Sequence, residues 1–200
     1  MQEELVLGTT NAGKVRELAA LLEPHGIRVV SLRDCPGALS VDETGASFAE
    51  NAALKACQQA VALSRWVLAE DSGLCVDALD GAPGIHSARF SGGGDDAANS
   101  DLLVRRLAGV PTSARGAHYA CHATLADPGG AVVAVASGIC RGWIATEPGG
   151  SGGFGYDPLF VVPEYHRTFG ELAPEVKGVI SHRARAMRAI LPAILRSFAG

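Results

Sequence analysis

The chain has 200 residues, 48% of them hydrophobic and 19% charged, which is typical of a globular protein and not of a disordered one. This length suits one domain, or two closely packed lobes, and allows a sizeable core. The net charge of -4 and the isoelectric point near 5.8 argue against broad binding to DNA or RNA, which needs a basic field.

The first third of the chain predicts strands that alternate with helices. Residues 5–7 form an apolar run that fits a strand, and the apolar residues of 15–22 recur at helical spacing until Pro24 and Gly26 end the helix. Residues 27–32 form a second short apolar run. This order is typical of a sheet with helices packed against it.

The next predicted helix opens with Ser47 and Glu50, which have the spacing of a capping box, and runs to about residue 64. Residues 66–69 fit another strand. We expect that strand to end in the turn-like sequence Glu70-Asp71-Ser72-Gly73.

The second half predicts a helix over 96–107 and an antiparallel hairpin whose arms cover 117–126 and 131–140. Residues 158–162 fit a buried strand, and Ser181 can cap a last helix. The predicted fold is a mixed α/β sheet with helices on both faces.

The cysteine pattern indicates the redox environment of the protein. All five cysteines lie at least 18 positions apart and form no C-x-x-C pair. The odd count and wide spacing favour reduced thiols over a disulfide frame or a zinc site. The acidic start does not resemble a signal peptide, and no apolar stretch approaches the ~18 residues of a membrane helix. We therefore expect a cytoplasmic protein with no membrane or nucleic-acid partner.

A phosphate loop is the first functional candidate. GTTNAGKV, residues 8–15, fits the pattern G-x-x-x-x-G-K-[ST] except that Val15 replaces the hydroxyl residue that holds Mg²⁺. Between a strand and a helix, the backbone N–H groups of Asn11 to Lys14 are expected to face an anion. A solvated turn would look much the same, but the context favours phosphate binding, with the metal held elsewhere.

Two acidic pairs offer metal ligands. Glu70 and Asp71 follow an apolar strand, where open α/β sheets bind ligands, and Asp42 and Glu43 precede the capped helix. Carboxylates from two loops, with phosphate oxygens and water, make an ordinary Mg²⁺ site. Each pair alone is better explained as a turn or a solvated loop. Together they supply what the phosphate loop lacks.

Lys55 shares one face of the capped helix with Ser47 and Asn51. It could reach a phosphate, although an exposed lysine is the commoner outcome. His118 and His122 share a strand face but have no acid nearby in the pattern, so we expect hairpin residues and not a metal site.

Two later segments could contact a ligand. In Gly153-Phe-Gly-Tyr-Asp157, a ring between glycines could stack on a flat ligand, while a turn with a core phenylalanine is the alternative. His182 and Arg183 put two cationic donors in the first turn of a helix, where the dipole opposes them unless an acceptor is bound. Lys177 lies just before them.

Six motifs occur in one order: TTNAGK, DETG followed by S-F-x-E-N-A-x-x-K-A, EDSGL, GAPGIHSAR, GGFGYDP and SHR. In these motifs the chain resembles the XTP/dITP diphosphatase family, the inosine triphosphate pyrophosphatase-like enzymes, over essentially its whole length. A phosphate-loop ATPase becomes the runner-up, and a noncatalytic nucleotide-binding protein stays open as a third reading.

The resemblance implies one domain over residues 1–200, with a mixed elongated sheet flanked by helices and a cleft between two lobes, and a homodimer. It implies hydrolysis of dITP, ITP or XTP to the monophosphate and pyrophosphate, which keeps deaminated purines out of DNA and RNA. It further implies Asp71 as general base and Mg²⁺ on Glu43 and Asp71, with Glu70 as a helper. The implied substrate-binding residues are Thr9, Thr10, Asn11, Ala12, Gly13, Lys14, Lys55, Ser72, Phe154, Gly155, Tyr156, Asp157, Lys177, His182 and Arg183.

The chain departs from the family pattern at two places. Some relatives carry Asp-Asp where this chain has Glu70-Asp71, and around Lys177 the usual acidic neighbour is Val176, with Gly178 following. The role of Glu70 and the geometry around Lys177 therefore stay open.

Overall fold

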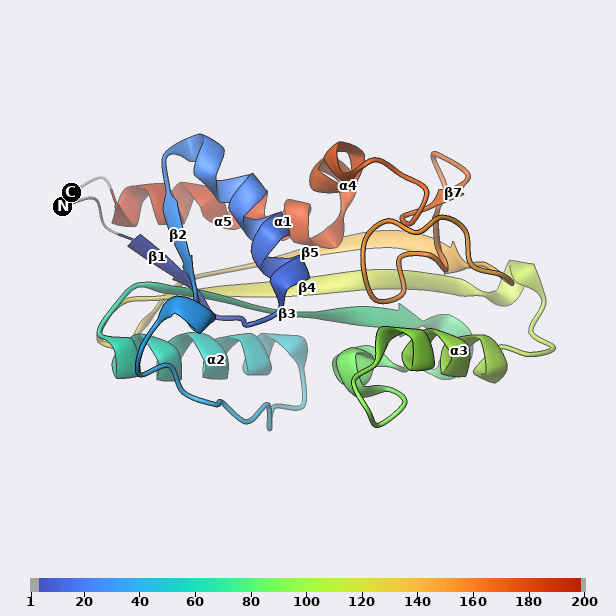
Figure 1. Ribbon diagram of the computed structural model, residues 1–200, viewed down its shortest axis with the longest axis horizontal. Helices are drawn as coiled ribbons and strands as arrows, with labels where there is room; N and C mark the ends of the chain where they lie inside the picture. Colours follow the sequence, from blue (N-terminus) through green and yellow to red (C-terminus); the bar gives the residue numbers. More distant parts are fainter. Residues whose placement is uncertain (1–3, 199–200) are drawn as a thin grey trace. The chain divides into compact units, whose positions relative to one another are not determined.

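The computed structural model describes residues 4–198. Within them, seven strands form one sheet in the order β2-β1-β3-β4-β5-β6-β7 (Figure 1). The strands are β1 (Glu4–Leu7), β2 (Arg28–Ser31), β3 (Val67–Val76), β4 (Gly116–Ala126), β5 (Val132–Ile144), β6 (Phe160–Val162) and β7 (Arg167–Thr168). The α-helices are α1 (Ala12–Leu22), α2 (Phe48–Leu63), α3 (Asp96–Arg106), α4 (Pro174–Ile180) and α5 (His182–Ser197).

The sheet is mixed, as the sequence predicts. β1 runs parallel to both of its neighbours, β2 and β3, with Leu7 opposite Leu68. β5 and β6 pair antiparallel, and so do β6 and β7. β4 and β5 are neighbours joined by a tight turn in which the Gly130 N–H donates to the Asp127 carbonyl at 2.8 Å, so the predicted hairpin is present.

The chain divides into two compact units, each built from separate segments. Unit 1 holds the described residues up to Asp71, Cys121–Gly138 and those from Arg183 on. Unit 2 holds Ser72–Ala120 and Ile139–His182. β3, β4 and β5 contribute residues to both units, so neither unit is one continuous stretch of sequence.

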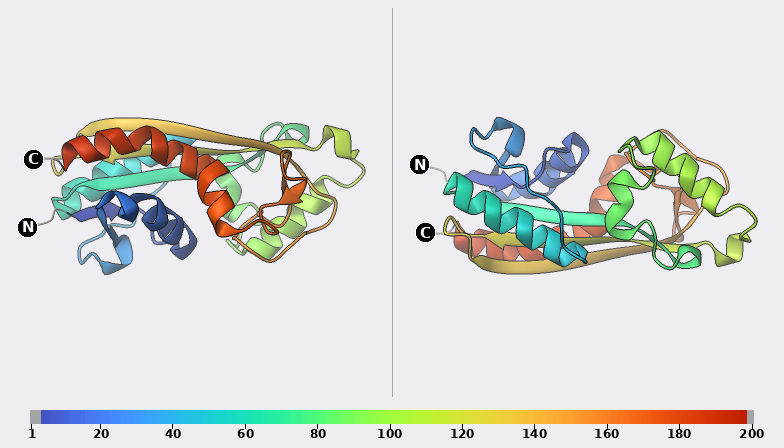
Figure 2. Two further views of the ribbon diagram at one scale, coloured as in Figure 1. Left: turned by 90° about the horizontal axis from the view of Figure 1, so that it is seen from above. Right: turned by 90° about the horizontal axis from the view of Figure 1, so that it is seen from below.

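In unit 1, α1 and α5 cover one face of the strands and α2 covers the other, as the two views of Figure 2 show. Successive strand residues point to opposite faces. The first core accordingly holds Leu5, Leu7 and Leu68 with apolar residues of α1 and α5. The second holds Val6, Val67 and Ala69 with alanines of α2. Burial on both faces explains why β1 and the start of β3 are continuously apolar.

Unit 2 has its own core. It combines residues of β3, β4, α3 and the segment 156–169, among them Leu74, Val76, Leu103, Leu107, Tyr119, Tyr156, Phe160 and Phe169. No helix within residues 4–198 has the length and apolarity needed to cross a membrane.

The expected end of the third strand at Ala69 is wrong, because β3 continues through Glu70 and Asp71 to Val76. Leu74 and Val76 are fully buried and carry the strand alternation onward. Their burial outweighs the turn preference of Asp-Ser-Gly. Glu70 and Asp71 are therefore consecutive residues of a strand and not part of a turn.

Two further details differ from expectation. Lys177 lies in α4, a helix the sequence analysis did not predict, and the predicted strand over 158–162 shortens to β6. The last helix begins at His182, directly after Ser181, and continues through Pro192.

Candidate active site

The segment 8–11 joins β1 to α1 and lies against β3. A Cβ atom on Gly8 would come within 2.7 Å of the Ala69 Cβ, so a larger residue would push the loop away from β3. Asn11 caps α1, because its side-chain oxygen accepts the Lys14 N–H at 3.1 Å. The Asn11 N–H in turn donates to Thr9 Oγ1 at 3.2 Å. Two of the four N–H groups expected to face an anion thus have partners inside the loop.

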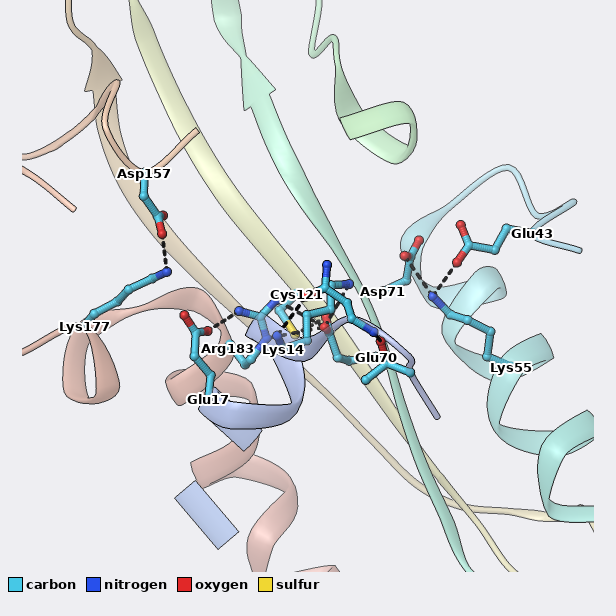
Figure 3. Close-up of polar contacts among 12 residues, drawn as sticks. Lys14, Glu17, Glu43, Lys55, Glu70, Asp71, Cys121, Asp157, Lys177 and Arg183 are labelled. Carbon is cyan, nitrogen blue, oxygen red and sulfur yellow. Dashed lines mark hydrogen bonds and ion pairs between the residues drawn. The ribbon is translucent and has the colours of Figure 1, made fainter. Parts of the chain in front are cut away.

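The chain contains three lysines, and each one pairs with a carboxylate (Figure 3). Lys14 contacts Glu70, Lys55 contacts Glu43 and Asp71, and Lys177 contacts Asp157. Their side chains are only 17%, 13% and 8% exposed. The lysines therefore belong to enclosed ionic clusters and not to a solvated surface.

Asp71 lies in a cluster on the α2 face of β3 (Figure 3). Lys55 Nζ lies 2.7 Å from Glu43 Oε1 and 3.1 Å from Asp71 Oδ1, so both carboxylates surround one cation. The buried Asn51 donates from Nδ2 to Asp71 Oδ2 at 3.3 Å and accepts the Gly45 N–H at 2.8 Å. Asn51 and Lys55, both in α2, thus hold the segment around Glu43 against β3.

The charges of this cluster shift the pKa values of Asp71 and Lys55. Burial raises the pKa of Asp71 above its usual value and Glu43 adds to the rise, while Lys55 opposes it. Burial alone would lower the pKa of Lys55, but Asp71 and Glu43 together raise it. Lys55 therefore stays charged beside a carboxylate that holds its proton more tightly than an exposed aspartate does.

Glu70 points to the opposite face of β3, among the residues of α1 and α5. Its Oε1 lies 2.9 Å from Lys14 Nζ and 3.2 Å from Arg183 Nη2. Its Oε2 accepts from the buried Cys121 thiol at 3.4 Å. Glu70 thus faces two cations on the α1/α5 side, whereas Glu43 and Asp71 meet on the α2 side. The role of Glu70 as a helper of the metal site stays a prediction.

The burial of Glu70 is compensated by charge. Burial would raise the pKa of Glu70, but Arg183, Lys14 and Lys55 hold it well below its usual value. Burial and the nearby Glu70 carboxylate raise the pKa of the Cys121 thiol well above its usual value. Arg183 is itself fully buried and also donates to Glu17 of α1. The carboxylate is ionised and the thiol is not.

In unit 2, Asp157 organises the segment 153–157. Asp157 Oδ2 accepts from Lys177 Nζ and, at 2.9 Å, from the Phe154 N–H (Figure 3). The Lys177 ammonium also lies 4.7 Å from the centre of the Phe154 ring, within cation–π range. Phe154 is half-buried at this turn and is not a core phenylalanine. The ring and the carboxylate expected to meet a flat ligand are therefore brought together.

The rest of this segment is fixed from several sides. The Gly155 N–H donates to Asp96 of α3 at 2.8 Å, and the Tyr156 hydroxyl donates to the Ser87 carbonyl at 2.8 Å. Burial raises the pKa of Tyr156, so its hydroxyl stays protonated. His182, at the start of α5, stacks on Tyr119 with ring centres 4.6 Å apart.

Several of these partners were missed by sequence reasoning: Glu17, Asn51, Ser87, Asp96, Tyr119 and Cys121. Asn51 carried a signal, because it shares a helix face with Lys55. The other missed residues pair with site residues that are distant in the sequence, so no local sequence pattern predicts these contacts. Of the remaining predicted residues, Thr10 lies in the loop before α1, Ala12 and Gly13 lie in the first turn of α1, and Ser72 lies on β3 beside Asp71.

Glu43 and Asp71 are the candidate protein ligands for a metal ion. Among residues 4–198, no group of three or more His, Cys, Asp or Glu side chains is placed to hold a metal ion. Glu43 and Asp71 supply two carboxylates within reach of one cation. Two hard oxygen ligands fit Mg²⁺, which usually takes one or two carboxylates and completes its shell with substrate phosphates and water.

Known proteins resemble this chain in both sequence and fold. The Ham1 family model matches residues 5–193. A dITP/XTP pyrophosphatase of Rhodopirellula baltica is 56% identical over 194 residues, covering 96% of this chain and 93% of that protein. The structure of a HAM1 protein from Coxiella burnetii matches with a TM-score of 0.86 and 36% identity, covering 98% of this chain and 99% of that one. A nucleoside-triphosphatase, or dITP/XTP pyrophosphatase, from Mycobacterium abscessus matches with a TM-score of 0.75 and 45% identity, covering 94% and 99%. Since family model, sequence and structure all match over nearly the whole length, the chain belongs to the Ham1 family.

Proposed function

We propose that the chain hydrolyses dITP, ITP and XTP to the nucleoside monophosphate and pyrophosphate, and so keeps deaminated purines out of DNA and RNA. Relatives named dITP/XTP pyrophosphatase are 56% and 53% identical over almost the full length. The observation in the structure that carries the proposal is the cluster of Glu43, Lys55 and Asp71, where two carboxylates from different segments meet at one cation.

In this proposal Asp71 orients and deprotonates the water that attacks the α-phosphorus. Asp71 fits this role because its carboxylate lies beside Lys55 and Glu43, in the cluster where the phosphates are proposed to bind. Phosphoryl transfer depends mainly on positioning and charge neutralisation, so Lys14, Lys55 and Lys177 neutralise the phosphates. No covalent intermediate is needed.

We further propose that Glu43 and Asp71 hold Mg²⁺, which would neutralise phosphate charge when bound. Both groups are hard carboxylates, which favours Mg²⁺ over softer metals. Activity should therefore disappear in excess EDTA and return with added Mg²⁺. Full activity in excess chelator would contradict the placement.

In this proposal Phe154 and Asp157 contact the base, and His182 or Arg183 donates to it. Hypoxanthine and xanthine carry a 6-keto acceptor where adenine carries an amino donor. A donor aimed at that position is satisfied by ITP and left unpaired by ATP, which costs about 1–3 kcal/mol per buried group.

One experiment tests the reaction. The protein is incubated with dITP and Mg²⁺, and the products are separated by ion exchange. Pyrophosphate and dIMP are expected. Orthophosphate and dIDP would instead show a phosphate-loop ATPase, and binding without product would show a noncatalytic nucleotide-binding protein. Glu4→Gln, outside the clusters, serves as the control for handling losses.

We also propose a homodimer in the cytoplasm. In unit 1, Val61, Val133 and Val135 are 59%, 46% and 70% exposed, and the two β5 valines share one strand face. All five cysteines are free thiols, which supports a reducing compartment. Light scattering should give twice the chain mass for the parent and the single-chain mass for Val135→Lys. A monomeric parent would contradict the dimer.

A further inference from the structure

Glu70 is a buried carboxylate that the proposed reaction does not use. It is 1% exposed, and an unpaired charge at that depth is strongly unfavourable. Both of its oxygens have donors: Oε1 faces Lys14 and Arg183, and Oε2 faces the Cys121 thiol. The carboxylate is therefore held in one orientation from three sides.

The partners of Glu70 come from elements far apart in the chain. Lys14 is in the first turn of α1, Arg183 is in the first turn of α5, and Glu70 on β3 contacts both (Figure 3). Arg183 Nε and Nη2 lie 3.4 and 3.2 Å from the same Oε1 that contacts Lys14 at 2.9 Å. Arg183 also donates to Glu17, one turn after Lys14 on α1. One oxygen atom thus fixes two cations at the starts of two helices.

Strand alternation separates this role from metal binding. Consecutive residues of β3 point to opposite faces, so Glu70 contacts α1 and α5 while Asp71 contacts α2. Lys14 has its ammonium on Glu70, and its side chain is only 17% exposed. A lysine held in this way keeps its charge at a fixed point and loses little further freedom when it meets a phosphate.

We propose that Glu70 is a positioning residue, which fixes the Lys14 ammonium for the phosphates and the Arg183 guanidinium for the base and so couples the two contacts. This rests on the proposed function for the roles of Lys14 and Arg183. It assigns Glu70 no contact with the substrate or the metal.

Three variants test the assignment. Glu70→Gln keeps the size of the side chain and removes its charge. Glu70→Asp keeps the charge on a shorter side chain. Glu4→Gln is the control, because Glu4 in unit 1 also pairs with two cationic side chains, Arg65 at 2.6 Å and Arg28 at 2.9 Å, but is 28% exposed and lies outside the clusters. Circular dichroism sets a temperature at which every variant is folded.

The kinetic arm separates positioning from stability. Glu70→Gln should lower kcat for dITP about 10²-fold, since small misplacements of a charge can cost that much. KM should stay within about threefold, because removing a negative charge beside Lys14 does not weaken attraction for a triphosphate. Glu70→Asp should recover part of kcat. A Glu70→Gln variant with parental kcat, whatever its melting temperature, would overturn the proposal.

A metal titration excludes the other reading of Glu70. The Mg²⁺ concentration for half-maximal activity should agree within about twofold between the parent and Glu70→Gln, because Glu70 points away from Glu43 and Asp71. A tenfold rise, with kcat restored at saturating Mg²⁺, would make Glu70 a metal ligand and overturn the proposal.

An NMR measurement of the lysine ammonium groups tests the anchoring without relying on enzymatic activity. With ¹⁵N-lysine the chain has three side-chain ammonium signals, assigned by Lys14→Arg and Lys55→Arg. The Lys14 signal should be sharp in the parent and in Glu4→Gln and lost to solvent exchange in Glu70→Gln, while the Lys177 signal persists. An unchanged Lys14 signal in Glu70→Gln would overturn the proposal.

The arms also separate this proposal from the proposed function. A parent that forms no pyrophosphate from dITP, but shows the expected ammonium signals, would refute the reaction and keep the anchoring of Lys14. A parent that forms pyrophosphate, with a Glu70→Gln variant equal to it in both arms, would refute the anchoring alone. If Glu70→Gln does not fold, Glu70→Asp decides: it should lose about tenfold in kcat, and parental kcat would overturn the proposal.

Discussion

Glu70 and Asp71 are adjacent and both acidic, yet their environments move their pKa values in opposite directions. The pKa of Asp71 is raised mainly by burial. The pKa of Glu70 is held low by Arg183 and Lys14, although burial alone would raise it. The sequence predicted both acids as candidate metal ligands. It could not separate them, because the strand was expected to end before them and alternation of faces applies only inside a strand.

The role of Asp71 gives the first prediction. Asp71→Asn should keep the fold and most nucleotide binding, because the amide fits the same space. Turnover of dITP should fall about 10²–10⁴-fold if Asp71 is the proposed general base, and further if it also holds the proposed metal. Steady-state kinetics with a binding assay checks this. Near-parental turnover would remove Asp71 from the mechanism.

Selectivity gives the second prediction. Arg183→Ala should lower kcat/KM for ITP more than for ATP, because a donor to the 6-keto group is lost. Lys14→Ala should lower both by similar factors, because a phosphate contact carries no information about the base. Any loss common to both nucleotides in Arg183→Ala reflects the shared Glu70 anchor. If Arg183→Ala depresses ITP and ATP equally, selectivity belongs to Phe154 to Asp157.

At the scale of elements, α2 positions the cluster of Glu43, Lys55 and Asp71. Its N-terminus is capped by Ser47, whose side chain accepts the Glu50 N–H, while Glu50 accepts the Ala46 N–H at 2.7 Å. The capping spacing in the sequence thus located the helix correctly. Lys55 was expected to reach a phosphate or solvent, and the structure places it between Glu43 and Asp71. The spacing of residues along a helix predicts which face they share. The partner that this face meets on the next strand depends on tertiary packing.

The third prediction compares two buried amides of α2. Asn51→Leu removes the bonds to Gly45 and Asp71, whereas Gln59→Leu removes two bonds to the Leu39 backbone, away from the cluster. Each should cost about 1–3 kcal/mol of stability through unpaired polar groups. Only Asn51→Leu should also lower kcat, by about tenfold, because Glu43 and Asp71 lose their common support. Equal kcat in the two variants, measured where both are folded, would argue against that role.

Strand and helix boundaries were predictable where periodicity and caps agree, as in α2 and α3. They failed where burial competes with turn chemistry, as in β3, and where a helix is short, as in α4. Segments such as 70–73 have a local preference for turns, and only the burial of Leu74 and Val76 decides against it.

For the whole molecule, the predicted mixed α/β fold and family are confirmed by the match of the Ham1 family model and by solved structures of the family. Six short motifs in order were enough for this, because each fixes several residue types at set spacing. The single domain over 1–200, the cleft and the homodimer stay predictions. These depend on packing between elements and between chains, which motif spacing does not encode.

The central claim is that water attacks the α-phosphorus of a deaminated purine nucleotide. Hydrolysis of dITP in H₂¹⁸O, followed by mass spectrometry of both products, tests it most directly. One ¹⁸O atom is expected in dIMP and none in pyrophosphate. The label in pyrophosphate or in orthophosphate would place the attack at another phosphorus and contradict it.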